Sequence, residues 1–364
     1  MCMYPQRRFI VALILLAATC FVCQSRIASA DDSLPAIRVQ NVRRVFDNGE
    51  HNAFTDLIRW KGKYWLTFRS CPDGHMVFST SSIIVLSSDD AKTWATVHQF
   101  SVPLRDTRDP HFLVFKDKLF IFTGTWYSGE GELPRADYDI NKHLGFAVCT
   151  KDGETWSPPQ QMEGTYGHYI WRAVTDGNTA WLCGRRKRGY SEAESGAGGA
   201  AILEGALLES TDGLNWKFRS LFQPQKGNET AFQILPDRTL IALSREQGST
   251  AQLARARPPY LTWQRTELPH YIGGPLLAQW GEHWLVGGRR STEAGPKTAI
   301  YWLVDDQLTA AAELPSGGDN SYPGFVALDS ERGLLSWYSS HEKNDQGKTV
   351  TAVYLADLVK DRSR

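Results

Sequence analysis

Six segments of the chain repeat one pattern, in which an apolar run, a tight polar turn and a second apolar run follow one another. The segments are 51–69, 108–125, 169–186, 228–245, 273–290 and 321–340. Their turns contain KG, KD, DG, PD, GE or DS, and short polar turns between apolar runs are typical of β-hairpins. Successive segments begin about 45–60 residues apart, which leaves room for two further strands in each unit. The repeat predicts an all-β chain folded as a six-bladed β-propeller with four-stranded antiparallel blades.

A second repeated motif falls between the hairpins and ends in tryptophan. It reads SSDDAKTW at 87–94, TKDGETW at 150–156 and STDGLNW at 210–216, with a reduced copy at 261–263. In such a turn the aspartate accepts backbone N–H groups, glycine supplies a positive φ, and tryptophan packs beneath the sheet. We therefore expect Asp89, Asp152 and Asp212 to be structural residues.

This turn resembles the Asp-box of the sialidase (neuraminidase) superfamily, whose members are six-bladed β-propellers. The six hairpin units and the three to four Asp-boxes match that architecture over nearly the whole chain after residue 30. Segments such as AFTDLIRWKGKYWLTFR and LPSGGDNSYPG are most similar to a bacterial branch of that superfamily. The resemblance implies a glycoside hydrolase of the exo-sialidase type. It also implies that the starts of the first strands and the ends of the second strands meet at one catalytic face.

Two segments resemble the sialidase catalytic motifs. The 228–245 segment resembles the one that supplies a catalytic glutamate and a substrate-binding arginine, which implies roles for Glu229 and Arg245. The segment that begins SYPG resembles the one that supplies the nucleophile, which implies that role for Tyr322. A neutral phenol is a poor nucleophile, and a neighbouring carboxylate that accepts its proton activates it. Sialidases are the glycosidases that use tyrosine in this way.

The remaining roles are open between several residues. For the acid/base residue, which in sialidases follows the first hairpin, the sequence offers Asp73 and His75. Arg289 is a further candidate for substrate binding, and Arg290 fits equally well.

The sialidase arginine that binds the substrate carboxylate has no counterpart at 53–55, and the last hairpin ends Tyr338-Ser339 where the family has Tyr-Glu. We expect other arginines, such as Arg69 or Arg172, to complete the substrate site.

Two other functions fit parts of the sequence. Asp56, Asp109 and Glu229 all lie at the starts of first strands, and Arg108-Asp109-Pro110 resembles a motif of propeller furanosidases. A glycosidase that uses only carboxylates, acting on a neutral sugar, is therefore one alternative. A propeller that binds glycans without cleaving them is the other. For each of these three functions, the expected binding partner is a glycan or a small sugar.

Residues 1–30 have the pattern of a secretory signal peptide. Arg7 and Arg8 precede an apolar run at 9–23, and the small residues of Ala28-Ser29-Ala30 fit a cleavage site. We expect residues 31–364 to form a single propeller domain that starts at about Asp31. The mature protein is then secreted or periplasmic, without a membrane span.

Charge and cysteine content narrow the function further. The chain has 40 basic and 40 acidic residues, and residues 1–30 carry three of the arginines and no acid. This balance argues against nucleic-acid binding, and it favours a solvent-exposed loop for the basic run 185–188. Three cysteines remain after residue 30, too few for a disulfide framework and without metal-ligand spacing. We expect a monomer that uses neither a cofactor nor a metal.

Overall fold

The computed structural model of the chain describes Met1 and residues 34–188, 202–246 and 250–361. Apart from Met1, the predicted signal peptide lies outside these residues. The described part is built of strands and two short 3₁₀ helices, η1 (Arg135–Asp137) and η2 (Ile140–Lys142). None of its helices has the length and apolar character needed to cross a membrane.

The strands follow the predicted hairpins in groups along the chain. The bounds are β1 (Ile37–Phe46); β2 (His51–Trp60), β3 (Lys63–Cys71), β4 (Ser82–Ser88) and β5 (Ala95–Phe100); β6 (Arg105–Phe115), β7 (Lys118–Tyr127), β8 (Leu144–Thr150) and β9 (Gln160–Gln161); β10 (Tyr169–Thr175), β11 (Ala180–Lys187), β12 (Leu203–Ser210) and β13 (Lys217–Gln223); β14 (Thr230–Ile234), β15 (Leu240–Ser244), β16 (Gln252–Ala256) and β17 (Gln264–Glu267); β18 (Gly273–Trp280), β19 (His283–Thr292), β20 (Gly295–Val304) and β21 (Gln307–Glu313); β22 (Asn320–Ala327), β23 (Arg332–Lys343) and β24 (Thr349–Lys360).

The hydrogen-bonded sheets are antiparallel blades in a propeller arrangement. Four sheets have four strands each, in the orders β6 to β9, β10 to β13, β14 to β17 and β18 to β21. The fifth sheet has eight strands, because β2 to β5 join β22, β23, β24 and β1 through one parallel bridge between His51 and Thr351. The hydrogen bonds thus define five sheets, and not the six separate four-stranded sheets that the sequence predicted. The first strand, β1, pairs antiparallel with the last strand, β24, so both lie in one sheet.

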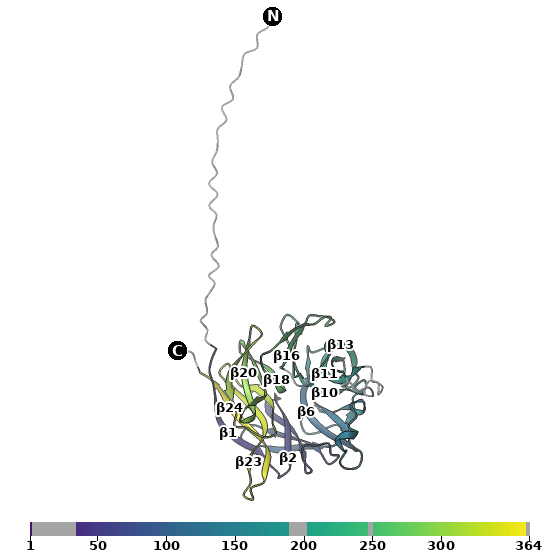
Figure 1. The fold of residues 1–364 in the computed structure, drawn as a ribbon, viewed down its shortest axis with the longest axis vertical. Coiled ribbons are helices and arrows are strands. Elements are labelled where there is room, and N and C mark those ends of the chain that lie inside the picture. The colour runs from purple at the N-terminus through teal and green to yellow at the C-terminus, as the bar shows by residue number, and fades with distance from the viewer. Residues whose placement is uncertain (2–33, 189–201, 247–249, 362–364) are drawn as a thin grey trace. The chain divides into compact units, whose positions relative to one another are not determined.

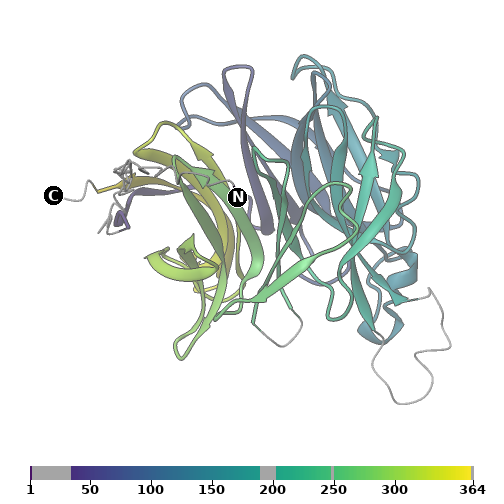
Figure 2. The ribbon, with the colours of Figure 1, turned by 90° about the horizontal axis from the view of Figure 1, so that it is seen from above.

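The first strands of the groups lie next to one another in a closed series. β2 contacts β6, β6 contacts β10, and the series continues through β14, β18 and β22 back to β2. Figure 1 shows β2, β6, β10 and β18 toward the middle of this part of the ribbon and β1, β13 and β23 further out, and Figure 2 shows the sheets stacked side by side. Residues far apart along the chain therefore meet at the ends of these inner strands.

The hydrophobic core lies between neighbouring sheets. In one cluster, Trp65 and Ile83 of the first group pack against Phe112 and Ile121 of the next. In another, Trp280 and residues of β20 pack against strands β23 and β24. Each sheet therefore buries both of its faces against a neighbour, which explains why the strands are rich in aromatic and aliphatic residues on both sides.

A β-bulge recurs near the start of the inner strands. The pairing between first and second strands shifts register in five groups, at β2, β6, β10, β18 and β22. Four bulges place a residue at positive φ, namely Phe54, Asp109, Gly274 and Tyr322. A bulge turns side chains away from the regular alternation of a strand. In these five inner strands the bulge occurs at the same end, where the catalytic face was predicted.

The repeated turns have the predicted hydrogen bonds, with one change of residue. Asp212 accepts the N–H groups of Leu214 and Asn215 at 2.8 and 2.7 Å. Asp152 accepts the equivalent pair of backbone N–H groups. In the first copy this role belongs to Asp90. The prediction for Asp89 is wrong, because Asp89 lies one residue before the position that accepts these hydrogen bonds. Its side chain is highly exposed and lies 3.5 Å from Lys63.

The three cysteines of the described part are free thiols. Cys71 and Cys183 are buried and Cys149 is partly buried. They pack as small apolar side chains.

Replacing Asp212 by alanine should lower the free energy of unfolding by about 1 kcal/mol, because the turn loses its backbone hydrogen bonds while solvent screens part of the effect. Asp89→Ala is the matched control and should leave stability unchanged. Chemical denaturation measures both. Equal losses, or none in either variant, would contradict the structural role given to this turn.

Candidate active site

A pocket of about 220 Å³ opens where the bulged ends of the inner strands meet. This is below the roughly 300–1,000 Å³ of sites for drug-sized ligands, so the pocket suits one sugar-sized ring. Its lining combines acids, arginines and aromatic rings. The lining residues are Phe54, His75, Arg108, Asp109, Trp126, Tyr169, Trp171, Arg185, Glu229, Arg245, Arg289 and Tyr322.

The centre of the pocket is a contact between a phenol and a carboxylate. Tyr322, on the bulge of β22, donates its hydroxyl to Oε1 of Glu229, which immediately precedes β14. The same oxygen accepts Nη1 of Arg245 at 2.8 Å, and Oε2 accepts the N–H of Gly274 at 2.6 Å. Tyr322, Glu229 and Arg245 are all residues predicted from the sequence, and the structure brings the three together.

The surroundings set the protonation of this pair. Burial opposes ionisation of Glu229, but the Arg245 guanidinium and the hydrogen bonds from Tyr322 and Gly274 lower the pKa of its carboxyl. Burial and the Glu229 charge raise the pKa of the Tyr322 phenol well above its ordinary value. At neutral pH a protonated phenol therefore faces an ionised carboxylate, which can accept the phenolic proton.

Asp109 contributes a second carboxyl group to the pocket. Tyr169 donates its hydroxyl to Oδ2 of Asp109, and Oδ1 is buried without a hydrogen-bond partner in the part of the chain that the structure describes. Burial raises the pKa of Asp109 to about 6, although the Arg108 charge opposes the shift. An unpartnered carboxyl oxygen in a pocket is a natural contact for a sugar hydroxyl.

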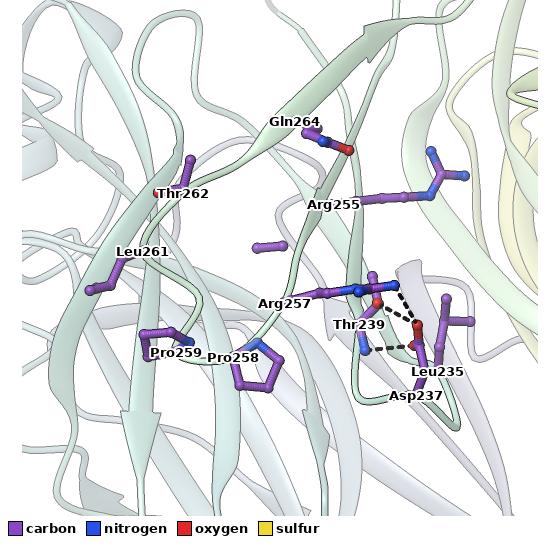
Figure 3. Close-up of a pocket in the computed structure, with 11 residues that line it drawn as sticks. Leu235, Asp237, Thr239, Arg255, Arg257, Pro258, Pro259, Leu261, Thr262 and Gln264 are labelled. Carbon is purple, nitrogen blue, oxygen red and sulfur yellow. Dashed lines mark hydrogen bonds and ion pairs between the residues drawn. The ribbon is translucent and has the colours of Figure 1, made fainter. Parts of the chain in front are cut away.

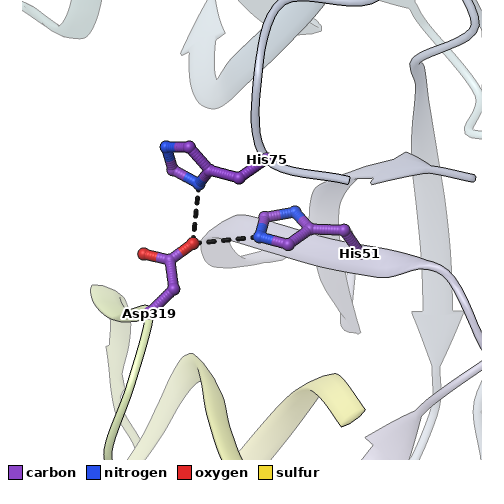
Figure 4. Close-up of side chains that lie close together, drawn as sticks. All are labelled: His51, His75 and Asp319. Atoms are coloured by element: carbon purple, nitrogen blue, oxygen red, sulfur yellow. Dashed lines mark hydrogen bonds and ion pairs between the residues drawn. The ribbon is translucent and has the colours of Figure 1, made fainter. Parts of the chain in front are cut away.

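His75 belongs to a network around Asp319, which directly precedes β22. Nδ1 of His75 and Nε2 of His51 lie 2.7 and 2.9 Å from the same oxygen, Oδ2 of Asp319 (Figure 4). The other oxygen, Oδ1, accepts the Tyr338 hydroxyl at 2.8 Å and Nη2 of Arg289 at 3.1 Å. The network holds both His75 and Arg289 at the edge of the pocket.

Within the described ranges, His51, His75 and Asp319 form the one group with the arrangement of metal ligands. Two imidazoles and a carboxylate can bind a divalent cation. However, the Arg289 guanidinium beside the same carboxylate opposes a further positive charge. The hydrogen bonds already satisfy the carboxylate, and we interpret the group as a positioning network.

Three other predicted residues are held in ion pairs. Arg69 is fully buried and pairs with Asp106 through Nε at 2.8 Å and Nη2 at 3.0 Å. Arg172 donates to Asp56 at 2.7 Å and to the backbone oxygens of Pro275 and Pro323. None of these side chains lines the pocket of about 220 Å³. Arg172 does line a smaller cavity, which shares Glu229 and Tyr322 with that pocket.

Asp56 and Arg172 instead form part of the packing between the inner strands. Asp56 also accepts the N–H of Phe112 at 2.8 Å. Burial opposes its ionisation, but Arg172 and the other donors lower its pKa to about 2. Asp73 lies outside the pocket and accepts the hydroxyl of Thr80.

The prediction of a solvent-exposed loop at 185–188 is wrong for most of the run, because β11 extends through Lys187. Arg186 and Arg188 pair with Glu204, each at 3.0 Å, whereas Arg185 turns into the pocket. The sequence feature that could have predicted this place for Arg185 is its position near the end of the second strand of a hairpin, which Arg245 and Arg289 share. No comparable signal pointed to Asp319.

A larger cavity, of about 820 Å³, lies elsewhere (Figure 3). It is formed by the β14–β15 turn and the segment that links β16 to β17, at the ends of β14 and β15 away from Glu229 and Arg245. Its one acid, Asp237, contacts Arg257 at 3.5 Å and accepts hydrogen bonds from Thr239. It contains no grouping comparable to Tyr322 and Glu229.

Comparison with known proteins supports the fold. No family model matches the sequence, and no curated protein matches it. Among solved structures, a protein of unknown function from Dyadobacter fermentans aligns with a TM-score of 0.73 and 19% identity over 90% of this chain and 100% of its own.

Two enzyme structures also align. Trypanosoma rangeli sialidase, in complex with sialic acid, has a TM-score of 0.60 and 14% identity over 88% of this chain. The alignment spans 59% of that sialidase. An α-L-arabinofuranosidase from Fusarium graminearum has a TM-score of 0.59 and 11% identity over 87% of this chain and 97% of its own. At these identities the likeness shows a shared propeller-type fold and leaves the reaction to be argued from the site.

Gly274→Ala should destabilise the protein by about 1–3 kcal/mol, because an added Cβ would lie 2.5 Å from the Tyr322 ring. Gly129→Ala is the control, since it has a similar positive φ but no atom within 4 Å of the added Cβ. Urea denaturation of both variants separates the steric cost from the backbone cost. Equal destabilisation would show that the tyrosine is not packed against Gly274.

Asp109→Asn should stabilise the protein at neutral pH. The folded-state pKa of about 6 lies above the ordinary 3.8, so the folded state holds a proton that the unfolded state releases between these values. Stability from this group is lost as pH rises from about 4 to 6, by about 2–3 kcal/mol in total. The variant should therefore exceed the parent in unfolding free energy at pH 7.5 but not at pH 4. A pH-independent difference would contradict the shift.

Proposed function

We propose that the protein is an exported, sialidase-like glycoside hydrolase that cleaves a terminal sugar with retention of configuration. The observation that carries this proposal is the Tyr322 phenol in contact with the ionised Glu229 carboxylate, inside a pocket with arginines and aromatic rings. The fold of the aligned sialidases supports it. We also infer six blades, with β22, β23, β24 and β1 as one of them, because six first strands form the closed inner series.

In the first step, the Tyr322 oxygen attacks the anomeric carbon while Glu229 accepts the phenolic proton. The bond to the leaving oxygen breaks, and an acid donates a proton to that oxygen. In the second step, water attacks the anomeric carbon and gives a proton to the deprotonated acid, while the Tyr322 oxygen leaves and takes its proton back from Glu229. Two displacements at one carbon retain the configuration. Glu229 can activate Tyr322 because the phenol is protonated before the reaction and the carboxylate that accepts its proton is already in contact with it.

For the acid/base we propose His75 rather than Asp73. His75 lines the pocket and its Nδ1 is held by Asp319, so Nε2 remains for the leaving group and the incoming water. Imidazole is suited to proton transfer near neutral pH. Arg245 and Arg289 bind the substrate from the side of Glu229, and Asp109 binds a sugar hydroxyl.

One alternative also has support from the site. Asp109 and Glu229 share the pocket, and the raised pKa of Asp109 suits an acid. In this alternative, the two carboxyl groups catalyse hydrolysis of the glycosidic bond of a neutral sugar, and no tyrosine nucleophile takes part. Asp56 would have no part in this reaction, since its oxygens are already bonded to Arg172 and Phe112.

A panel of aryl glycosides, sialosides included, tests the proposal with the mature chain. Tyr322→Phe and Glu229→Gln should each lower kcat/KM about a thousandfold, which corresponds to about 4 kcal/mol of transition-state stabilisation. Tyr166→Phe is the control, because Tyr166 is exposed and lies outside the pocket.

The variants also separate the alternatives. Full activity of Tyr322→Phe together with loss in Asp109→Asn would favour the carboxylate-only reaction. Binding of a sugar with no turnover of any glycoside in the panel would identify a glycan-binding propeller and refute the proposed hydrolase.

A further inference from the structure

Arg185 differs from the other arginines of the pocket in its partners. Arg245 pairs with Glu229 at 2.8 Å, and Arg289 contacts Asp319 at 3.1 Å. Arg108 lies 3.5 Å from Asp106. In the described part of the chain, no carboxylate pairs with Arg185.

Aromatic rings take the place of an acid around Arg185. Its guanidinium lies 5.7 Å from the centre of the Tyr169 ring and 5.5 Å from that of Trp171. Its Nε is buried and has no hydrogen-bond partner among the described residues. Both rings also line the pocket, so they and Arg185 form one continuous wall of it.

This arrangement has an energetic consequence. Burial lowers the pKa of Arg185, and the Glu229 charge opposes this shift only in part, so the protein environment disfavours the Arg185 charge. A buried charge without a direct ion-pair partner is costly, and packing alone does not require arginine at this position. Stacked guanidinium groups keep their edge donors available, and these donors match the oxygens of carboxylates and sulfates.

We propose that Arg185 binds an oxyanion on the substrate sugar, a carboxylate or a sulfate, on the wall formed by Tyr169 and Trp171. This subsite is separate from Arg245 and Arg289, whose charges Glu229 and Asp319 already balance. The inference rests on the proposed function, since the acidic group would belong to the sugar whose glycosidic bond is cleaved. On this inference the substrate is an acidic sugar, and its acidic substituent binds to Arg185 on β11.

Calorimetric titration with free sugars tests the subsite without requiring hydrolysis. The probes are D-glucuronate, D-galacturonate and the 6-sulfates of D-glucose and D-galactose, each compared with its neutral parent sugar. At least one acidic probe should bind ten or more times more tightly than its parent, and added salt should reduce the difference. The preference for uronate or sulfate identifies which oxyanion the subsite takes.

Arg185→Gln should abolish the difference between acidic and neutral sugars, whereas Arg185→Lys should retain part of it. Arg188→Gln is the control, because Arg188 pairs with Glu204 outside the pocket. Equal binding of every acid and its parent, or an acid preference that survives in Arg185→Gln, overturns the inference. Acid binding that depends on Arg185 in a protein that hydrolyses no glycoside would instead overturn only the proposed function.

Discussion

The Glu229 carboxylate is the interaction on which the site depends. It is buried, and it receives donors from three other places in the chain: the phenol of Tyr322, the guanidinium of Arg245 and the backbone N–H of Gly274. Hydrogen bonds to a buried anion are strong, and removing one leaves a charge without compensation. The carboxylate therefore fixes the relative positions of β14, β18 and β22 at the pocket, and it keeps the tyrosine next to its base.

The repeated bulge explains why such a carboxylate finds these partners. Regular alternation would send successive side chains of an inner strand to the two neighbouring sheets. At Asp109, Gly274 and Tyr322 the positive φ breaks the alternation at the same end of each strand. Side chains that would otherwise enter the core between sheets therefore meet at one opening. The arginines at the ends of the second strands then surround that opening.

Much of the fold and the central residues of the site could be predicted from the sequence, because the motifs that indicate the fold are repeated along the chain. Six hairpins and three tryptophan-ended turns indicated the blades, and the resemblance of two segments to sialidases indicated Glu229, Arg245 and Tyr322. Arg69 and Arg172 could not be separated from substrate-binding arginines, since only the structure shows their pairing with Asp106 and Asp56. Asp319 carried no local pattern, because its importance comes from contacts with residues about 240–270 positions earlier. No sequence pattern indicated that a single bridge would connect β2 with β24.

The most direct measurement of the central claim is the mass of the protein after incubation with a fluorinated glycosyl donor that is turned over slowly. If Tyr322 is the nucleophile, the intact mass should rise by one glycosyl unit, and peptide mapping should place the label on Tyr322. The label should not form in Tyr322→Phe. Stable labelling of Asp109 or Glu229 in its place would contradict the account and assign the chemistry to the carboxylates alone.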